Sequence, residues 1–161
     1  MLRFVWQSAR APRDGTACAT IRRVSPAAAL ARLRKVCLSF EDASLRPSHG
    51  APTFFVRGKH AFVMFLDNHH GDGRLAIWCA AAPGIQGALV DAEPEHYFVP
   101  PYVGPSGWLG VRLDRGVDWK QVAELCEQAY LERTAKLKKA KGKRPSESAH
   151  RRSNAGPDAE I

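Results

Sequence analysis

The sequence lacks the features that identify a membrane protein, an exported protein or a small disulfide-stabilised domain. Its apolar stretches are interrupted by charge, proline or glycine well before the roughly 18 to 20 residues that a membrane-spanning helix needs. No continuous apolar stretch of the secretory type follows the basic N-terminus. The four cysteines are widely separated and form no CxxC pair, which argues against a zinc knuckle and a disulfide framework. We therefore expect a cytoplasmic protein without membrane association, whose thiols are reduced and packed.

Recognisable catalytic and cofactor motifs are also missing. The glycines form neither a Walker motif nor a dinucleotide-binding fingerprint, and no serine lies in a nucleophile elbow. Ser48 and His49 are adjacent in the chain, which is too close for a self-evident pair of nucleophile and base. Pairs of acids such as Asp67 and Asp72 are common in polar loops by chance. We therefore expect no enzymatic activity, and we assign no catalytic residue and no cofactor.

The composition suits one compact domain with additional segments at both ends. Of the 161 residues, 45% are hydrophobic, which is enough for a real core. Residues 1–24 carry five basic and one acidic side chains, residues 25–131 carry ten and eleven, and residues 132–161 carry nine and four. The central body is therefore nearly neutral, and the net charge of +8 comes from the two ends. Long-range attraction to polyanions is expected mainly from these ends.

The two terminal segments are expected to be flexible. The Arg-rich, acid-poor composition of residues 1–24 fits a mitochondrial transit peptide, an unstructured extension or a start site assigned too far upstream. Residues 134–161 are hydrophilic and densely charged, and Gly142 and Pro145 are expected to stop any continued helix. We thus predict a folded domain at 25–133 between a flexible extension and a disordered basic tail.

Two amphipathic helices are predicted near the ends of the domain. Ser25 is a suitable N-cap and Pro26 a suitable first helical residue, and Leu30, Leu33 and Cys37 follow at helical spacing. A short helix is expected over 83–92. The closing helix begins at a capping sequence over 118–121. Its apolar stripe consists of Val122, Leu125, Cys126 and Ala129.

Between the helices, the pattern predicts an antiparallel sheet. Runs of β-branched and aromatic residues separated by turn formers favour a meander followed by one further strand. The strands are expected over 53–57, 60–66, 74–80 and 108–113. Both faces of 60–66 are apolar, which places that strand in the middle of the sheet, whereas 40–52 is expected to be an irregular connection. The predicted fold class is α+β, with the first and last helices on one face of the sheet.

Four phrases in one order carry a resemblance to a known family. They are SHGAPTFFVRGK at 48–59, DNHHGDGRLAIWC at 67–79, FVPPYVGPSGWLGVRLD at 98–114 and VDWKQVAELCEQAY at 117–130. Over about residues 26–130 the chain resembles the MmcQ/YjbR family. The resemblance implies a frataxin-like (CyaY-like) α+β sandwich and a double-wing mode of DNA binding. The long N-terminal extension departs from the family pattern, as does Thr134-Ala135-Lys136, where the family commonly has Ala-Pro-Lys.

Candidate nucleic-acid contacts come from two loops, one strand and the basic tail. Guanidinium and ammonium groups neutralise phosphates, and an exposed indole stacks on an unpaired base. The candidates are Arg57, Lys59, His69, His70, Arg74, Trp108, Arg112, Lys138, Lys139, Lys141, Lys143 and Arg144. Ordinary surface charge and a buried indole are the alternative interpretation of the same residues. The expected partner is DNA, and the expected state is a monomer.

The histidine loop has the residue types of a divalent metal site, because His69 and His70 lie between Asp67 and Asp72. Adjacent side chains seldom converge on one ion, so we retain a solvated turn and expect no metal. His49 would approach this loop if the preceding hairpin folds beside it.

A small-ligand or protein-interaction module is the rival function, with the Pro100-Pro101-Tyr102 loop and the histidine loop lining a pocket. Basic residues gathered on one continuous face would favour nucleic acid, and their dispersal around an apolar pocket would favour a ligand. The positions of four basic residues would distinguish these two functions, namely Arg57, Lys59, Arg74 and Arg112.

Overall fold

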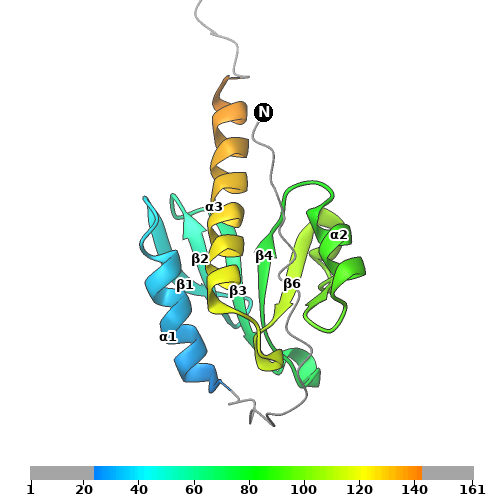
Figure 1. The fold of residues 1–161 in the computed structure, drawn as a ribbon. Helices are drawn as coiled ribbons and strands as arrows, with labels where there is room; N and C mark the ends of the chain where they lie inside the picture. The colour runs from blue at the N-terminus through cyan, green and yellow to red at the C-terminus, as the bar shows by residue number, and fades with distance from the viewer. Residues whose placement is uncertain (1–23, 143–161) are drawn as a thin grey trace, which may run out of the picture.

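The computed structural model describes residues 24–142, which form one antiparallel sheet and three α-helices (Figure 1). The helices are α1 (Pro26–Cys37), α2 (Ile85–Ala92) and α3 (Trp119–Gly142). The strands are β1 (Ala43–Ser48), β2 (Ala51–Val56), β3 (His60–Asp67), β4 (Leu75–Ala80), β5 (Tyr97–Phe98) and β6 (Trp108–Arg112). No helix among residues 24–142 combines the length and apolar character needed to cross a membrane. The predictions for residues 1–23 and 143–161 lie outside the described residues, as does Cys18.

The predicted α+β architecture is confirmed. The six strands follow the order β1-β2-β3-β4-β6-β5, and each neighbouring pair is antiparallel. The strand β3 lies between β2 and β4, as its apolar faces predicted. Figure 1 shows α1 and α3 on the same face of this sheet. The observed bounds of the predicted strands differ from the expected ones by at most two residues.

The helix α1 begins where its sequence predicts. The Ser25 side chain accepts a hydrogen bond from the Ala28 backbone N–H at 3.3 Å, and Pro26 occupies the first turn. Ala29, Leu33 and Cys37 are its buried residues. Their spacing of four places one stripe of the helix on the sheet.

The irregular connection predicted for 40–52 is wrong, because Ala43–Ser48 forms the strand β1. This segment contains Arg46 and Pro47 and has no apolar alternation, so nothing local favours a strand. It pairs along the whole of β2, from Ala43 opposite Val56 to Ser48 opposite Ala51. An edge strand tolerates proline, since one side of its backbone makes no ladder bonds. Pairing with β2 therefore decides the conformation of β1.

The helix α3 is anchored to the sheet by aromatic contacts. The Tyr130 ring stacks on Phe40 at 4.9 Å between centroids and meets Phe62 edge-on at 5.8 Å. Its hydroxyl donates a hydrogen bond to the Glu41 carbonyl at 3.0 Å. These contacts join α3 to the segment after α1 and to β3, so both helices are held on one face.

The prediction of disorder from residue 134 is wrong for 134–142, which continue α3 to Gly142. Alanine, lysine and leucine in this stretch are good helix formers, and Leu137 packs against the core. The Lys136 ammonium lies 2.9 Å from the Glu132 carboxylate one turn earlier. Figure 1 shows the end of α3 projecting beyond the sheet. The prediction of disorder relied on the density of charge and overlooked the helical propensity of residues 134–142.

The described cysteines are free thiols in the core between the helices and the sheet. Cys37, Cys79 and Cys126 are all buried. A hydrogen bond with Cys37 and burial hold the pKa of Cys126 well above its ordinary value. Burial also raises the pKa of Cys79, so Cys79 and Cys126 are uncharged packing residues at neutral pH.

One buried polar atom stands out at the end of the sheet. The Tyr97 hydroxyl is buried and has no hydrogen-bond partner among the described residues. Burial raises the pKa of Tyr97 to about 12, with further contributions from Glu93 and Cys79. Ionisation of this hydroxyl is thus suppressed, yet its desolvation is uncompensated.

We expect Tyr97→Phe to leave the free energy of unfolding unchanged or to raise it by about 1 kcal/mol. The substitution removes a buried polar atom that forms no hydrogen bond and keeps the ring. Urea denaturation of both proteins at one pH measures the difference. A loss of more than about 1 kcal/mol would show that the hydroxyl is hydrogen-bonded in solution.

Candidate functional site

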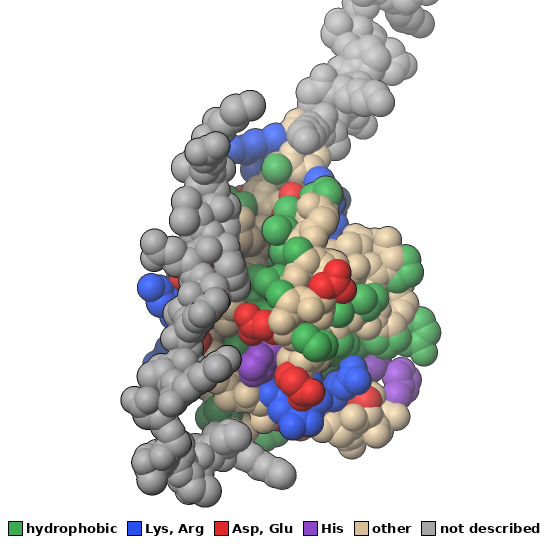
Figure 2. Space-filling view, turned by 45° about the vertical axis from the view of Figure 1, so that its right-hand side comes forward, with side chains coloured by type: hydrophobic (Ala, Val, Ile, Leu, Met, Phe, Trp, Pro, Cys, Tyr) green, Lys and Arg blue, Asp and Glu red, His purple; other side chains and the backbone are tan. Residues whose placement is uncertain are grey.

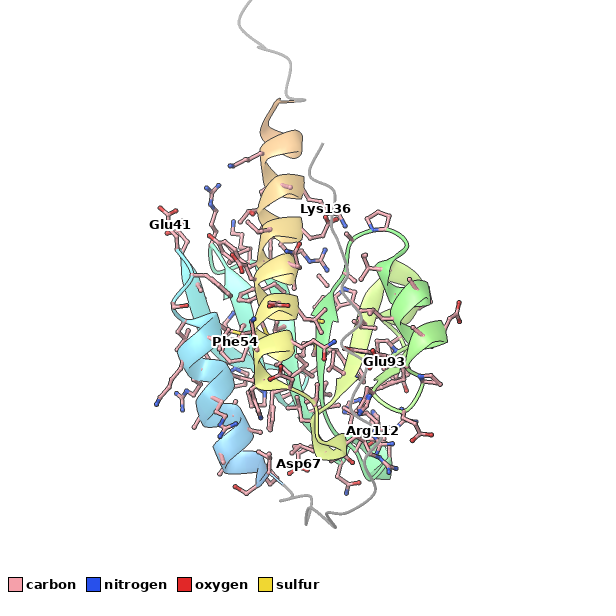
Figure 3. The ribbon with its side chains drawn as sticks, viewed as in Figure 1. Glu41, Phe54, Asp67, Glu93, Arg112 and Lys136 are labelled. Carbon is pink, nitrogen blue, oxygen red and sulfur yellow. The ribbon has the colours of Figure 1, made fainter. Side chains whose placement is uncertain are left out.

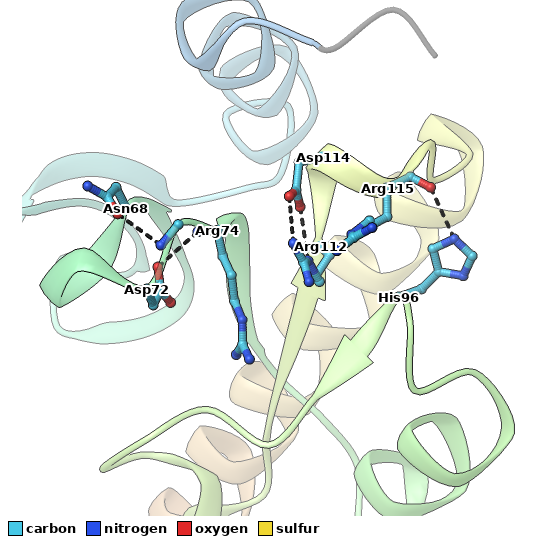
Figure 4. Close-up of polar contacts among 8 residues, drawn as sticks. Asn68, Asp72, Arg74, His96, Arg112, Asp114 and Arg115 are labelled. Atoms are coloured by element: carbon cyan, nitrogen blue, oxygen red, sulfur yellow. Dashed lines mark hydrogen bonds and ion pairs between the residues drawn. The ribbon is translucent and has the colours of Figure 1, made fainter. Parts of the chain in front are cut away.

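The loop between β3 and β4 is held by its own polar side chains (Figure 4). The Asn68 side-chain oxygen accepts a hydrogen bond from the Gly73 backbone N–H at 2.9 Å, and the Asp72 carboxylate accepts one from the Arg74 N–H at 3.0 Å. Asn68 and His70 have left-handed backbones, with φ of 51° and 53°. The residues predicted to form a turn therefore stabilise the loop itself. Within residues 24–142, no three His, Cys, Asp or Glu side chains are grouped as metal ligands.

The two loop histidines have different surroundings. The half-buried His69 meets the Trp78 ring edge-on, with centroids 5.0 Å apart, whereas His70 is exposed. The His70 ring lies 4.1 Å from the His69 ring and 6.4 Å from the Tyr102 ring. The fold thus brings the β3–β4 loop beside the loop over 99–104.

The loop over 99–104 presents an exposed aromatic ring on a fixed backbone. Tyr102 is 80% exposed and has a φ of 64°, a left-handed conformation that is uncommon for a residue other than glycine. The Val103 N–H donates to the Pro101 carbonyl at 2.7 Å, and the Gly104 N–H donates to the Pro100 carbonyl at 3.0 Å. The Tyr102 ring is therefore displayed by a closed turn.

The Arg74 side chain lies on an aromatic platform. Its guanidinium carbon is 4.4 Å from the centroid of Phe98, and Phe98 lies against Gly110 of β6. A Cβ atom on residue 110 would lie 2.5 Å from the Phe98 ring. Among residues 24–142 no carboxylate forms an ion pair with Arg74, although the side chain is half-buried. Its positive charge is thus available to an anion.

The neighbouring Arg112 differs, because its charge is compensated. Its Nε and Nη2 atoms donate to the two carboxylate oxygens of Asp114 at 3.1 and 2.7 Å (Figure 4). The hydrogen bond with Asp114 raises the pKa of Arg112 above its ordinary value. Partial burial works to raise the pKa of Asp114, but hydrogen bonds from Arg112 and the backbone outweigh it, so that pKa is lowered. Arg112 was a predicted phosphate contact, and the structure instead makes it part of this closed pair.

The candidates Arg57 and Lys59 lie at the opposite end of the sheet. Arg57 and Gly58 both have positive φ, 52° and 65°, which forms the tight turn from β2 to β3. Arg57 pairs with Asp42 at 3.5 Å across an exposed contact, and Lys59 is exposed. The strand β3 separates this turn from the histidine loop by roughly 25 Å. The four basic residues that were to decide between functions are therefore divided between opposite ends of the sheet.

Trp108 is a core residue. Its side chain is 6% exposed, and the guanidinium carbon of Arg133 on α3 lies 5.1 Å from the ring centroid. Burial lowers the pKa of Arg133, although Glu132 works in the opposite direction. The hypothesis that this indole stacks on a base is therefore wrong, because the ring is buried and the Arg133 guanidinium lies over it. The alternative interpretation, a buried indole, is confirmed.

A small pocket lies between the β1–β2 hairpin and the histidine loop. Its volume is about 170 Å³, and His49, Asp67 and His69 are among its lining residues. His49 therefore does approach the histidine loop, and its Nδ1 atom is 3.1 Å from the Ser48 hydroxyl. The proline-rich loop does not line this pocket. Small-molecule sites usually enclose about 300 to 1,000 Å³, so this pocket suits a very small ligand at most.

The surface near the histidine loop carries charges of both signs. Figure 2 shows basic, acidic and histidine side chains side by side at the lower end of the described body. Figure 3 places Asp67 and Arg112 at this end and Lys136 at the other. No strongly basic face is therefore visible from this side.

The strongest concentration of one charge lies along the end of α3. We call residues 136–144 the basic segment, since they contain six basic and no acidic side chains. Lys138 is exposed, and Lys139 and Lys141 also belong to the helix. Lys143 and Arg144 lie outside the described residues. Helical structure up to Gly142 was not expected for these candidates.

We expect Gly110→Ala to lower the free energy of unfolding by about 1 to 3 kcal/mol, because the new methyl group displaces the Phe98 ring. Urea denaturation measures the loss. The matched control is Gly87→Ala in α2, where no atom lies within 4 Å of the new Cβ and stability should rise by about 1 kcal/mol. An unchanged stability in Gly110→Ala would contradict the close packing.

We expect Asp114→Asn to lower the free energy of unfolding by about 1 kcal/mol at pH 7, because the variant cannot form the bidentate pair with Arg112. The pKa of Asp114 is lowered in the folded state, so its contribution is present above the ordinary pKa of 3.8 and disappears as the pH falls through the folded value. Stability measured against pH should therefore show the two proteins converging in acid. A constant difference down to the lowest pH would contradict this assignment.

Comparison with known proteins agrees with the fold. A family model described as YjbR matches residues 38–132, which is more than half of the chain. The crystal structure of Deinococcus radiodurans protein DR2400, with a DUF419 domain, is 21% identical and superposes with a TM-score of 0.59, covering 71% of this chain and 84% of that one. This similarity shows a shared fold. No curated protein matches the chain. With its fold and its matched sequence in agreement, the chain belongs to the YjbR family.

Proposed function

We propose that this protein binds DNA without enzymatic chemistry and that the basic segment supplies the main phosphate contacts. The observation that carries the proposal is the run of six basic and no acidic side chains over 136–144, which begins on the projecting end of α3. Each lysine or arginine that neutralises a phosphate releases a counterion from DNA. Such binding is favourable for any sequence and is sensitive to salt.

The charges of the body support this assignment to the basic segment. Residues 25–131 hold ten basic and eleven acidic side chains. Arg57 is paired with Asp42, and Arg112 is paired with Asp114. Two of the four basic residues first considered in the body are thus compensated, and the four are divided between opposite ends of the sheet. A dedicated duplex-binding face on the body has correspondingly little support.

A small-ligand function is the second candidate, and the pocket between His49 and His69 favours it. The volume of about 170 Å³ restricts the ligand to a few heavy atoms. The pocket therefore gives weaker support than the basic segment.

The test compares the full chain with a variant in which Lys138, Lys139, Lys141 and Lys143 are replaced by glutamine. We expect the variant to bind a short DNA duplex more weakly at fixed ionic strength. Its salt slope should fall by up to about 0.9 for each phosphate that the variant no longer neutralises. Fluorescence anisotropy across a salt series measures both quantities.

The matched control replaces four exposed basic residues elsewhere with glutamine, namely Arg34, Lys35, Arg115 and Lys120. Its net charge equals that of the first variant, so an equal reduction of affinity in both would mean that only total charge matters. Absence of any binding by the unaltered chain at low salt would refute the proposal.

A further inference from the structure

Packing in the core does not explain why Tyr102 is held in its conformation. The ring is 80% exposed and contributes little to the core, yet its backbone is held at a φ of 64° within a hydrogen-bonded turn. A non-glycine residue in this region is strained, so the surrounding structure must maintain it. Beside it lies a second exposed ring in a left-handed conformation, that of His70 at 6.4 Å. Two loops distant in sequence thus display adjacent rings to solvent.

The register of the sheet relates these rings to Arg74 through Trp78 of β4 and Phe98 of β5, which lie on either side of Gly110 of β6. The His69 ring meets Trp78, and His70 follows it next to Tyr102. We call His70, Arg74, Phe98 and Tyr102 the loop surface. It combines exposed π faces with a guanidinium.

The charge of Arg74 is oriented by its packing. The Phe98 ring supports the guanidinium at 4.4 Å, and Phe98 itself lies directly on the backbone of Gly110. Asp72 is nearby, but its carboxylate accepts a hydrogen bond from the Arg74 backbone, not from the guanidinium. The adjacent carboxylate of Asp114 is occupied by Arg112 through two hydrogen bonds. The loop surface therefore offers one anion-binding group beside rings that can stack.

We propose that the loop surface binds single-stranded nucleic acid, with an unpaired base stacked on Tyr102 and His70 and a neighbouring phosphate at Arg74. An aromatic side chain can stack only on a base whose face is free, and in a duplex the neighbouring base pairs cover these faces. The inference rests on the proposed function for its ligand class, but it concerns different residues. The basic segment attracts either form of DNA, and the loop surface distinguishes the single strand.

The experiment measures the affinity of the full chain for an oligothymidine of about 12 nucleotides and for a duplex of equal length. We expect Tyr102→Ala to weaken single-strand binding roughly 5- to 100-fold, which is the usual effect of removing one stacking ring, and to change duplex binding less than about twofold. Tyr102→Phe keeps the ring and should bind like the unaltered chain. Leu131→Ala removes an exposed apolar side chain from α3 and is the matched control.

A second measurement tests the phosphate contact. Arg74→Gln should lower the salt slope for the oligothymidine by about 0.7, the value for one contact with a single strand. An unchanged slope would remove Arg74 from the site. Equal effects of Tyr102→Ala on both forms of DNA, or no effect on either, would overturn the inference.

The outcomes separate this inference from the proposed function. If the variant without lysines 138, 139, 141 and 143 binds more weakly while Tyr102→Ala changes nothing, the basic segment binds DNA and the loop surface does not. If only Tyr102→Ala reduces single-strand affinity, the loop surface stands and the role of the basic segment fails. Failure of the unaltered chain to bind either form overturns both.

Discussion

The arrangement of the loop surface depends on the absence of a side chain at residue 110. Phe98 comes from the short edge strand β5, and its ring rests on β6 where a Cβ would lie 2.5 Å away. That close approach gives Arg74 an aromatic support at 4.4 Å. A larger residue would lift the ring and leave the guanidinium without its platform. The orientation of one cation therefore depends on a packing constraint in a neighbouring strand.

The antiparallel register explains why the basic residues of the body do not cooperate. Successive hairpins return the chain to alternate ends of the sheet, so the turn after β2 and the loop after β3 lie at opposite ends. Arg57 belongs to the first end, and Arg74 and Arg112 belong to the second. Ion pairs then compensate Arg57 and Arg112 locally. Arg74 forms no ion pair among residues 24–142, and the sequence concentrates further basic residues in the basic segment.

The helix α3 links the core to that segment. Its first turns bury Val122, Cys126 and Ala129, and Tyr130 closes the contact with Phe40. The later turns leave the sheet and carry the lysines that the sequence concentrates there (Figure 1). The beginning of this continuous helix therefore packs in the core, and its end carries the lysines.

The sequence by itself determined the α+β class, the helices α1 and α3, the central position of β3 and the concentration of charge at the ends. Each depends on local periodicity, capping or composition, which act over a few neighbouring residues. It also identified the histidine loop and Arg74 as candidates, although it did not associate them with Tyr102 or Phe98.

Only the tertiary structure decided the rest. The strand β1 exists because β2 offers a partner, and Trp108 is buried with the Arg133 guanidinium of α3 over its ring. His70 and Tyr102 meet because two loops that are distant in the sequence fold together. Such contacts depend on pairing between distant segments, and one sequence without its fold carries no local signal for them.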